Sequence, residues 1–149
     1  MKFFVYGMPK PQPRPRACMR GKHAGIYDAG TANGWKYLIA RTARDNAPEK
    51  PFDCAVGLSL VFVLPRPKNH YLPATKSRPQ ETLRQNAPIL NTTKPDIDNY
   101  VKAVMDALTD SQVIWRDDAQ VVMISASKIY EDAKTKCGVE ISIEDLEYE

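Results

Sequence analysis

The stretch KPDIDNYVKAVMDALTD, residues 94–110, begins with two closely spaced aspartates and continues with apolar side chains at helical spacing. The apolar positions recur every three or four residues: Tyr100, Val101, Val104, Met105 and Leu108. This periodicity predicts an amphipathic helix that begins near Asp96 or Ile97 and buries one face in a hydrophobic core. The rest of the fold has to be arranged around that buried face.

The remaining chain alternates apolar runs with polar segments that are rich in proline. Residues 55–64, AVGLSLVFVL, are strongly apolar and β-branched, and they predict a central strand. A second amphipathic helix is expected over about residues 31–46, with Thr31 as its N-cap. Shorter runs predict further strands at residues 3–7, 120–130 and 137–145.

The order strand, helix, strand, helix, strand, strand is typical of an α+β (or α/β) domain, in which two main helices pack on a small mixed β-sheet. The sequence has 149 residues and shows neither an internal repeat nor a domain linker, so residues 1–149 are expected to form one compact domain. Val139, Ile141 and Ile143 alternate with polar residues, which predicts a sheet with one buried and one solvated face.

Two segments concentrate positive charge on a chain whose formal net charge is only +3. Residues 9–22 hold five lysines and arginines and no acidic residue, and their proline-rich part is expected to be an extended, exposed loop. Residues 65–95 hold six lysines and arginines against one glutamate, with six prolines, and are expected to be a long basic loop. Together they indicate a polyanionic partner, although charged loops are often merely solvated.

Other features argue against several classes of protein. Cys18, Cys54 and Cys137 are far apart and odd in number, which argues against a disulfide framework and a zinc site and predicts free thiols. No run approaches the ~18 consecutive apolar residues of a membrane span, and the first residues lack the apolar core of a signal peptide. We therefore expect a cytoplasmic protein, and no organic cofactor.

Acidic side chains gather around the expected start of the helix at residues 94–110. Lys102 follows Asp98 by one helical turn, and Asp117 and Asp118 come shortly after the helix. Carboxylates held close together repel one another unless a cation binds, and Mg²⁺ prefers oxygen ligands. If Asp118 starts the next strand beside the helix, Asp96, Asp98 and Asp118 are expected to hold such an ion. Lys102 would then meet the negative charge that develops on a phosphodiester.

Each part of this pattern also has a purely structural explanation. Aspartates favour helix N-termini, so capping accounts for one or both of Asp96 and Asp98. Asp98 and Lys102 at i, i+4 form an ordinary helix pair that contributes only a few tenths of a kcal/mol. Asp117 and Asp118 fit a solvated turn. Spacing alone therefore supports a metal site and a structural role about equally.

Two segments of the chain resemble one known family. PDIDNYVKAVMDALTD (residues 95–110) and VIWRDDAQV (residues 113–121) are similar to the signature of the RusA family of Holliday junction resolvases. That signature is D-x-D-N-x-x-K-x-x-x-D-A-L, followed by W-x-D-D-x-Q-V. The opening GMPKPQPRPR (residues 7–16) resembles the N-terminal segment of many phage and prophage members, whereas residues 20–90 are similar only in general layout.

The resemblance implies a homodimeric, magnesium-dependent endonuclease that cuts four-way DNA junctions by paired symmetric nicks in a bacterial host. It implies four site residues: Asp96, Asp98 and Asp118 as metal ligands or catalytic carboxylates, and Lys102 as an essential basic residue. Asp117 ranks below Asp118. A nuclease for flaps or replication forks and a non-catalytic protein that binds branched DNA are the alternatives.

The candidates for DNA contact are the cations nearest these motifs: Arg14, Arg16, Arg20 and Lys94. Asn99 and Asp106 belong to the resembled signature, but capping or packing explains either of them without a chemical role. The chain departs from the signature in two places. Pro95 stands where some members have an arginine-rich run, and the segment between Leu108 and Trp115 is one residue longer than in the best-known form.

Overall fold

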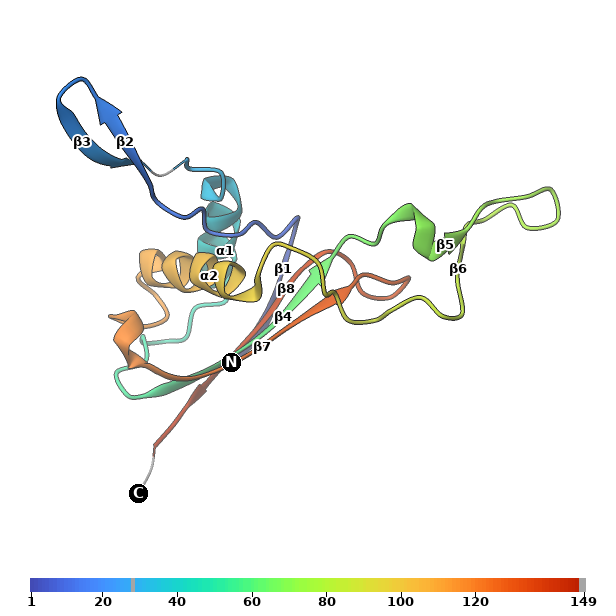
Figure 1. Cartoon of the computed structure of the whole chain (residues 1–149). Coiled ribbons are helices and arrows are strands. Elements are labelled where there is room, and N and C mark those ends of the chain that lie inside the picture. The colour runs from blue at the N-terminus through green and yellow to red at the C-terminus, as the bar shows by residue number, and fades with distance from the viewer. Residues whose placement is uncertain (28, 148–149) are drawn as a thin grey trace.

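The computed structural model describes residues 1–27 and 29–147. A four-stranded sheet carries two helices on one face, and two small hairpins extend away from this body (Figure 1). The predicted single α+β body with a mixed sheet and two main helices is confirmed.

Strand β4 (Val56–Leu64) occupies the interior of the sheet, as its apolar run predicted. The strand order is β1-β8-β4-β7, where β1 spans Lys2–Tyr6, β7 spans Val121–Tyr130 and β8 spans Gly138–Asp145. β4 pairs in parallel with β7 and antiparallel with β8, which makes the sheet mixed. β7 and β8 follow one another in the chain but are not neighbours, because β4 lies between them.

The sheet is amphipathic, and only one of its faces is packed. In β8, Val139, Ile141 and Ile143 are fully buried, whereas the alternate residues are partly exposed. On the open face, the amine of Lys2 lies 3.0 Å from the carboxylate of Glu140 on the paired strand. The predicted division into a buried and a solvated face is therefore confirmed.

The two helices, α1 (Asn33–Asp45) and α2 (Ile97–Ser111), contact each other and close the hydrophobic core. The predicted start of α2 near Asp96 or Ile97 is confirmed, because the helix begins at Ile97 with Asp96 at the N-cap position. The Thr31 cap is wrong, because the N-cap position of α1 is Ala32 and no side chain caps this end. Among the described residues, no helix has the length and apolar character needed to cross a bilayer.

The two basic segments contain more regular structure than the sequence predicted. The first includes a hairpin of β2 (Arg16–Arg20) and β3 (His23–Tyr27). The second contains a short 3₁₀ helix, η1 (Lys68–His70), and a small hairpin, β5 (Tyr71–Leu72) with β6 (Thr82–Leu83). These ribbons depend on backbone pairing and bury little apolar surface, so they leave no hydrophobic periodicity in the sequence.

Gly138 provides a test of how β8 fits against β1. Its φ of 154° is unfavourable for other residues, and a Cβ there would overlap the carbonyl oxygen of Val5 and the ring of Phe4. We expect Gly138→Ala to lower the free energy of unfolding by about 2–4 kcal/mol, measured by urea denaturation. The matched control is Gly34→Ala in α1, where a Cβ meets no atom within 4 Å. This variant should raise stability by up to about 1 kcal/mol.

Candidate functional site

The N-terminus of α2 presents two aspartates to solvent. Asp96 occupies the N-cap position with extended backbone angles (φ −70°, ψ 147°), and Asp98 lies in the first turn. The Asp96 side chain accepts no capping hydrogen bond, so the expected capping role is wrong for this residue. Both side chains are exposed, and neither forms a hydrogen bond or ion pair with any described residue. Their carboxylate oxygens are therefore available to a ligand.

The segment that leads into α2 is held by a lysine that the sequence analysis missed. Lys128 of β7 donates hydrogen bonds from its amine to the carbonyl oxygens of Thr93 (2.6 Å) and Pro95 (2.8 Å), next to Asp96. The Lys94–Pro95 peptide bond between these two carbonyls is cis. In the parallel β4–β7 pair, Lys128 is aligned with the buried Phe62. The only signal in the sequence was a lysine at a position of the strand that faces the helices.

Lys102 forms an ion pair with Asp106 rather than with Asp98. Its amine lies 2.7 Å from the Asp106 carboxylate, and Lys36 of α1 approaches the same carboxylate at 3.7 Å. The hydrogen bond to Asp106 raises the pKa of Lys102, and the negative charges of Asp106 and Asp118 raise it further against the opposing effect of desolvation. Lys102 therefore stays positively charged through neutral and mildly alkaline pH. Asp106, the motif residue without an assigned role, orients it.

The two adjacent aspartates after α2 have different environments. Asp117 precedes the short 3₁₀ helix η2 (Asp118–Gln120), and its Oδ1 accepts a hydrogen bond from the Ala119 backbone N–H at 2.7 Å. The Gln120 side chain completes a capping box: its Oε1 accepts from the Arg116 and Asp117 backbone N–H groups at 2.8 and 3.2 Å. Asp117 is thus a structural cap, consistent with its lower rank in the sequence analysis.

Asp118 is the aspartate of this pair whose side chain caps no backbone group. It begins η2 rather than the strand, which starts three residues later at Val121, so the expected position at the start of a strand is wrong. η2 contacts α2, and the Asp118 charge acts on Lys102. The side chain has no hydrogen-bond or ion-pair partner among the described residues.

The carboxylates do not form a closed ligand cage. Across residues 1–27 and 29–147, no group of three or more His, Cys, Asp or Glu side chains is assembled in a way that could hold a metal ion. Asp96, Asp98 and Asp118 are therefore not assembled into one such group in the described part of the chain.

A cation-lined hollow of about 650 Å³ opens beside Asp96. Arg14, Arg16 and Lys94 line it, whereas Arg20 lies at the far end of β2 and does not. The proline-rich segment that carries Arg14 had been expected to be fully exposed, but its residues 11–13 are partly buried. The Gln12 backbone N–H donates to the Asn99 carbonyl oxygen at 2.9 Å, which attaches the segment to the first turn of α2.

An acid and lysine site next to a cation-lined hollow has the chemical groups that phosphodiester hydrolysis on DNA requires, so the site is of the kind that a nuclease needs. A family model described as "Endodeoxyribonuclease RusA" matches residues 7–144, and the chain belongs to this family. The family consists of Holliday junction resolvases, and this protein is accordingly an endodeoxyribonuclease of that kind. The match also covers residues 20–90, where the sequence alone had shown similarity only in general layout.

The chain is also similar to a protein of Bacillus subtilis (strain 168) that carries the name "Uncharacterized protein YqaN". The two are 34% identical over 132 residues, which is 89% of each chain. That name carries no statement of activity, so the similarity does not refine the function.

Gln120 should be the residue on which the η2 turn depends. Besides its two acceptor contacts, its Nε2 donates to the carbonyl oxygens of Phe52 (2.8 Å) and Cys54 (3.0 Å). We expect Gln120→Ala to cost about 2–3 kcal/mol in urea denaturation, because two partly buried carbonyl oxygens and two exposed N–H groups lose their partner. Gln80→Ala, an exposed control, should change stability by less than about 0.5 kcal/mol.

Proposed function

We propose that the protein is a magnesium-dependent endonuclease that cuts four-way DNA junctions by paired symmetric nicks, with residues 1–149 acting as one endonuclease domain. The observation that carries the proposal is the pair of unengaged carboxylates at the start of α2, Asp96 and Asp98, one turn from the charged amine of Lys102. A protein that only bound DNA would gain nothing from acids placed where they repel phosphate.

The donor set fits a hard cation. Asp96, Asp98 and Asp118 offer carboxylate oxygens without internal partners, which suits Mg²⁺ better than a softer metal. Mg²⁺ usually binds through one or two carboxylates together with waters and substrate phosphates rather than in an all-protein cage. The absence of a closed cage among the described residues is therefore compatible with an ion shared with the DNA.

The acidic and basic residues of the site then have different tasks. Asp96, Asp98 and Asp118 would hold the ion, which when bound polarises the phosphodiester and lowers the pKa of a water. Lys102 places a fixed positive charge beside them, where negative charge develops on the phosphate oxygens. Asp106 keeps that amine oriented through its 2.7 Å contact.

The DNA backbone would approach through the hollow beside Asp96. Arg14, Arg16 and Lys94 supply phosphate contacts there, and Arg20 extends the basic surface along the β2–β3 hairpin. Because this hollow adjoins Asp96, a strand held by these cations would pass close to the carboxylates.

The test uses a synthetic four-way junction with Mg²⁺ and the variant Asp96→Asn. Asparagine is an equally good residue at a helix N-terminus, so folding should be unaffected while a metal-binding charge is lost. We expect cleavage to fall roughly 10²-fold or more, with junction affinity retained. The measurement is the rate of product formation on denaturing gels, alongside a binding titration without Mg²⁺.

Asp110→Asn, which removes an exposed aspartate near the other end of the same helix, is the matched control and should cleave as the wild type does. Asp117→Asn should also remain active, because the asparagine amide oxygen would still accept the capping hydrogen bond. Equal activity of Asp96→Asn and wild type would refute the proposed site.

A panel of DNA flaps and replication forks separates a junction resolvase from a nuclease that acts on other branched DNA. Binding of the four-way junction without any cleavage would favour the alternative of a non-catalytic protein that binds branched DNA.

We further propose that two copies associate through the N-terminal half of β7. In the described chain this half pairs only with β4, and it leaves Val122, Met123 and Ile124 exposed by 61%, 54% and 46%. Residues 121–127 include no charge or proline of the kind that usually protects an edge strand. An antiparallel two-fold pairing would cover this edge and place two identical sites on a substrate with approximate two-fold symmetry.

Ile124→Lys should weaken this association, because it places a charge in the proposed pairing edge. We expect light scattering after gel filtration to give twice the chain mass for the wild type and a shift toward the single-chain mass for the variant. Ile26→Lys, at an 81% exposed isoleucine of β3, is the matched control and should stay dimeric. A wild type of single-chain mass, or an unchanged mass in Ile124→Lys, would contradict the interface.

A further inference from the structure

The β2–β3 hairpin has two chemically different faces. Residues that pair across an antiparallel ribbon share a face, and alternate residues along each strand point to opposite faces. One face is apolar and carries Ala17, Met19, Ala24 and Ile26. The other face holds the basic side chains and a cysteine: Arg16, Cys18, Arg20 and His23. The turn between the strands has only two residues, Gly21 (φ 64°) and Lys22, which fixes the register and keeps the two faces distinct.

The apolar face of this hairpin is open to solvent. Met19 is 69% exposed and Ile26 is 81% exposed, and Figure 1 shows the hairpin extending away from the sheet. The two side chains are diagonal neighbours, because Ile26 lies two residues beyond Ala24, the partner of Met19. A two-stranded ribbon gains no stability from large apolar side chains that remain in water. Their position therefore indicates a surface that a partner covers.

The charge around this face favours a nucleic acid as the partner. Residues 9–27 contain five lysines and arginines and no acidic residue. Arg16 and Arg20 form no hydrogen bond or ion pair with any described residue, so their guanidinium groups are available to phosphates. DNA offers phosphates to the basic face of the hairpin and the flat surfaces of its bases to the apolar face.

The hairpin rises from the cation-lined hollow beside Asp96. Arg16 lines this hollow on the β2 side, and Ala29 lines it on the β3 side. A strand advances about 3.3 Å per residue, so Met19 lies about 10 Å beyond Arg16, and Ile26 lies closer to the hollow. A DNA strand advances about 3.4 Å per nucleotide, so a strand whose phosphates pass Asp96 would meet the apolar face within about three nucleotides.

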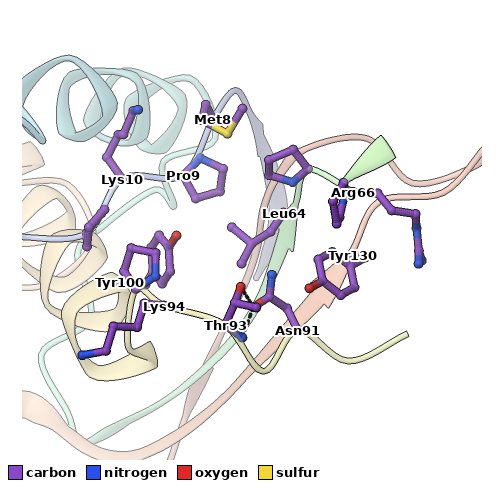
Figure 2. A pocket seen from close by; sticks show the side chains of 14 residues that line it. Met8, Pro9, Lys10, Leu64, Arg66, Asn91, Thr93, Lys94, Tyr100 and Tyr130 are labelled. Carbon is purple, nitrogen blue, oxygen red and sulfur yellow. Dashed lines mark hydrogen bonds between the residues drawn. The ribbon is translucent and has the colours of Figure 1, made fainter. Parts of the chain in front are cut away.

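The aromatic surface on the other side of the site is already covered. A second hollow, of about 590 Å³, adjoins the first and is lined by Tyr100 and Tyr130 (Figure 2). Both tyrosines are buried: Tyr100 packs against Phe62, and the Arg66 guanidinium lies over the Tyr130 ring. These rings are closed to a base, whereas the apolar side chains of the hairpin are open to one.

We propose that Met19 and Ile26 form an apolar wedge that lies against the face of a base pair at the branch point of the DNA. The inference rests on the proposed function and specifies how that site recognises a branch. Within a continuous duplex, a wedge enters only by breaking the stacking of a base step. At a branch point the strands exchange and the stack opens more easily, so the same apolar contact forms at a lower cost. The wedge therefore favours branched over linear DNA.

The experiment places 2-aminopurine, one position at a time, at the branch point of a four-way junction and at the nucleotides on each side of it. The fluorescence of this base rises when it loses its stacking partners. Complexes are formed without Mg²⁺ so that the DNA stays intact. We expect the wild type to raise the fluorescence at one or more positions next to the branch point, and to leave it unchanged for the same base in linear duplex.

The double variant Met19→Gln/Ile26→Thr makes the face polar while it keeps the length of one side chain and the β-branch of the other. We expect the fluorescence rise to be lost and junction affinity to fall about tenfold. Affinity for linear duplex should stay the same, because Arg16 and Arg20 still contact phosphates.

Two controls separate the apolar surface from other effects of substitution. Met19→Leu/Ile26→Val keeps the face apolar and should retain both the fluorescence rise and the junction affinity. Ile89→Thr makes one of the polar changes at a 70% exposed isoleucine outside the hairpin and should also retain both.

Three results would overturn the wedge. The first is equal behaviour of the polar and the apolar double variants, and the second is a parallel fall in affinity for junction and linear duplex. The third is a change in the chain mass of the polar variant without DNA, because the apolar face would then contact a second copy of the chain.

Cleavage of unmodified junction by the wild type is measured in parallel with Mg²⁺. If the junction is cut but the polar variant behaves as the wild type does in fluorescence and affinity, the wedge is refuted and the proposed nuclease stands. If only the polar variant loses the fluorescence rise and no substrate is cut, the wedge stands as a site for branched DNA and the proposed cleavage is refuted.

Discussion

The burial of one face of α2 in the hydrophobic core is the constraint on which the rest of the site depends. Ala103, Val104, Ala107 and Leu108 are almost completely inaccessible, and Tyr100 contacts Phe62 of β4. Because this face is fixed, the opposite side of the same helix must carry Asp98 and Lys102 to the surface. Lys128 then fixes the entrance to the helix from the adjoining strand, and Gln12 attaches the proline-rich segment to its first turn. The helix, its entrance and the neighbouring segment are thus fixed by other contacts, so the carboxylates of Asp96 and Asp98 are not needed to hold the structure together.

The sequence predicted what hydrophobic periodicity records. The start of α2, the interior strand β4 and the one-sided sheet each depend on burial, and each was visible as a spacing of apolar residues. The hairpins β2–β3 and β5–β6 were missed because backbone pairing without burial leaves no such spacing. The Thr31 cap was wrong for a similar reason, since caps depend on local backbone geometry more than on the identity of one residue.

The sequence named the residues of the proposed site but not the contacts between them. The sequence named Lys102 and ranked Asp118 above Asp117, and the structure supplies a physical basis for that order, because Asp117 is occupied as a cap. The sequence did not show that Asp106 would bind Lys102 in place of Asp98, since both lie one turn from the lysine. Lys128 was also missed, because its partners are backbone carbonyls more than thirty residues away.

The basic residues fall into two groups according to what their positive charges contact. Lys128, Lys36 and Arg66 direct their positive groups at carbonyls and a carboxylate of the protein itself, whereas Arg14, Arg16 and Lys94 face a hollow. Only cations of the second kind displace condensed counterions when DNA binds. On the proposed DNA path, the slope of log affinity against log salt concentration would count Arg14, Arg16 and Lys94, and the formal charge of +3 is no guide to it. A chain with little net charge can bind a polyanion in this way, because some of its cations contact protein groups while others remain available to phosphates.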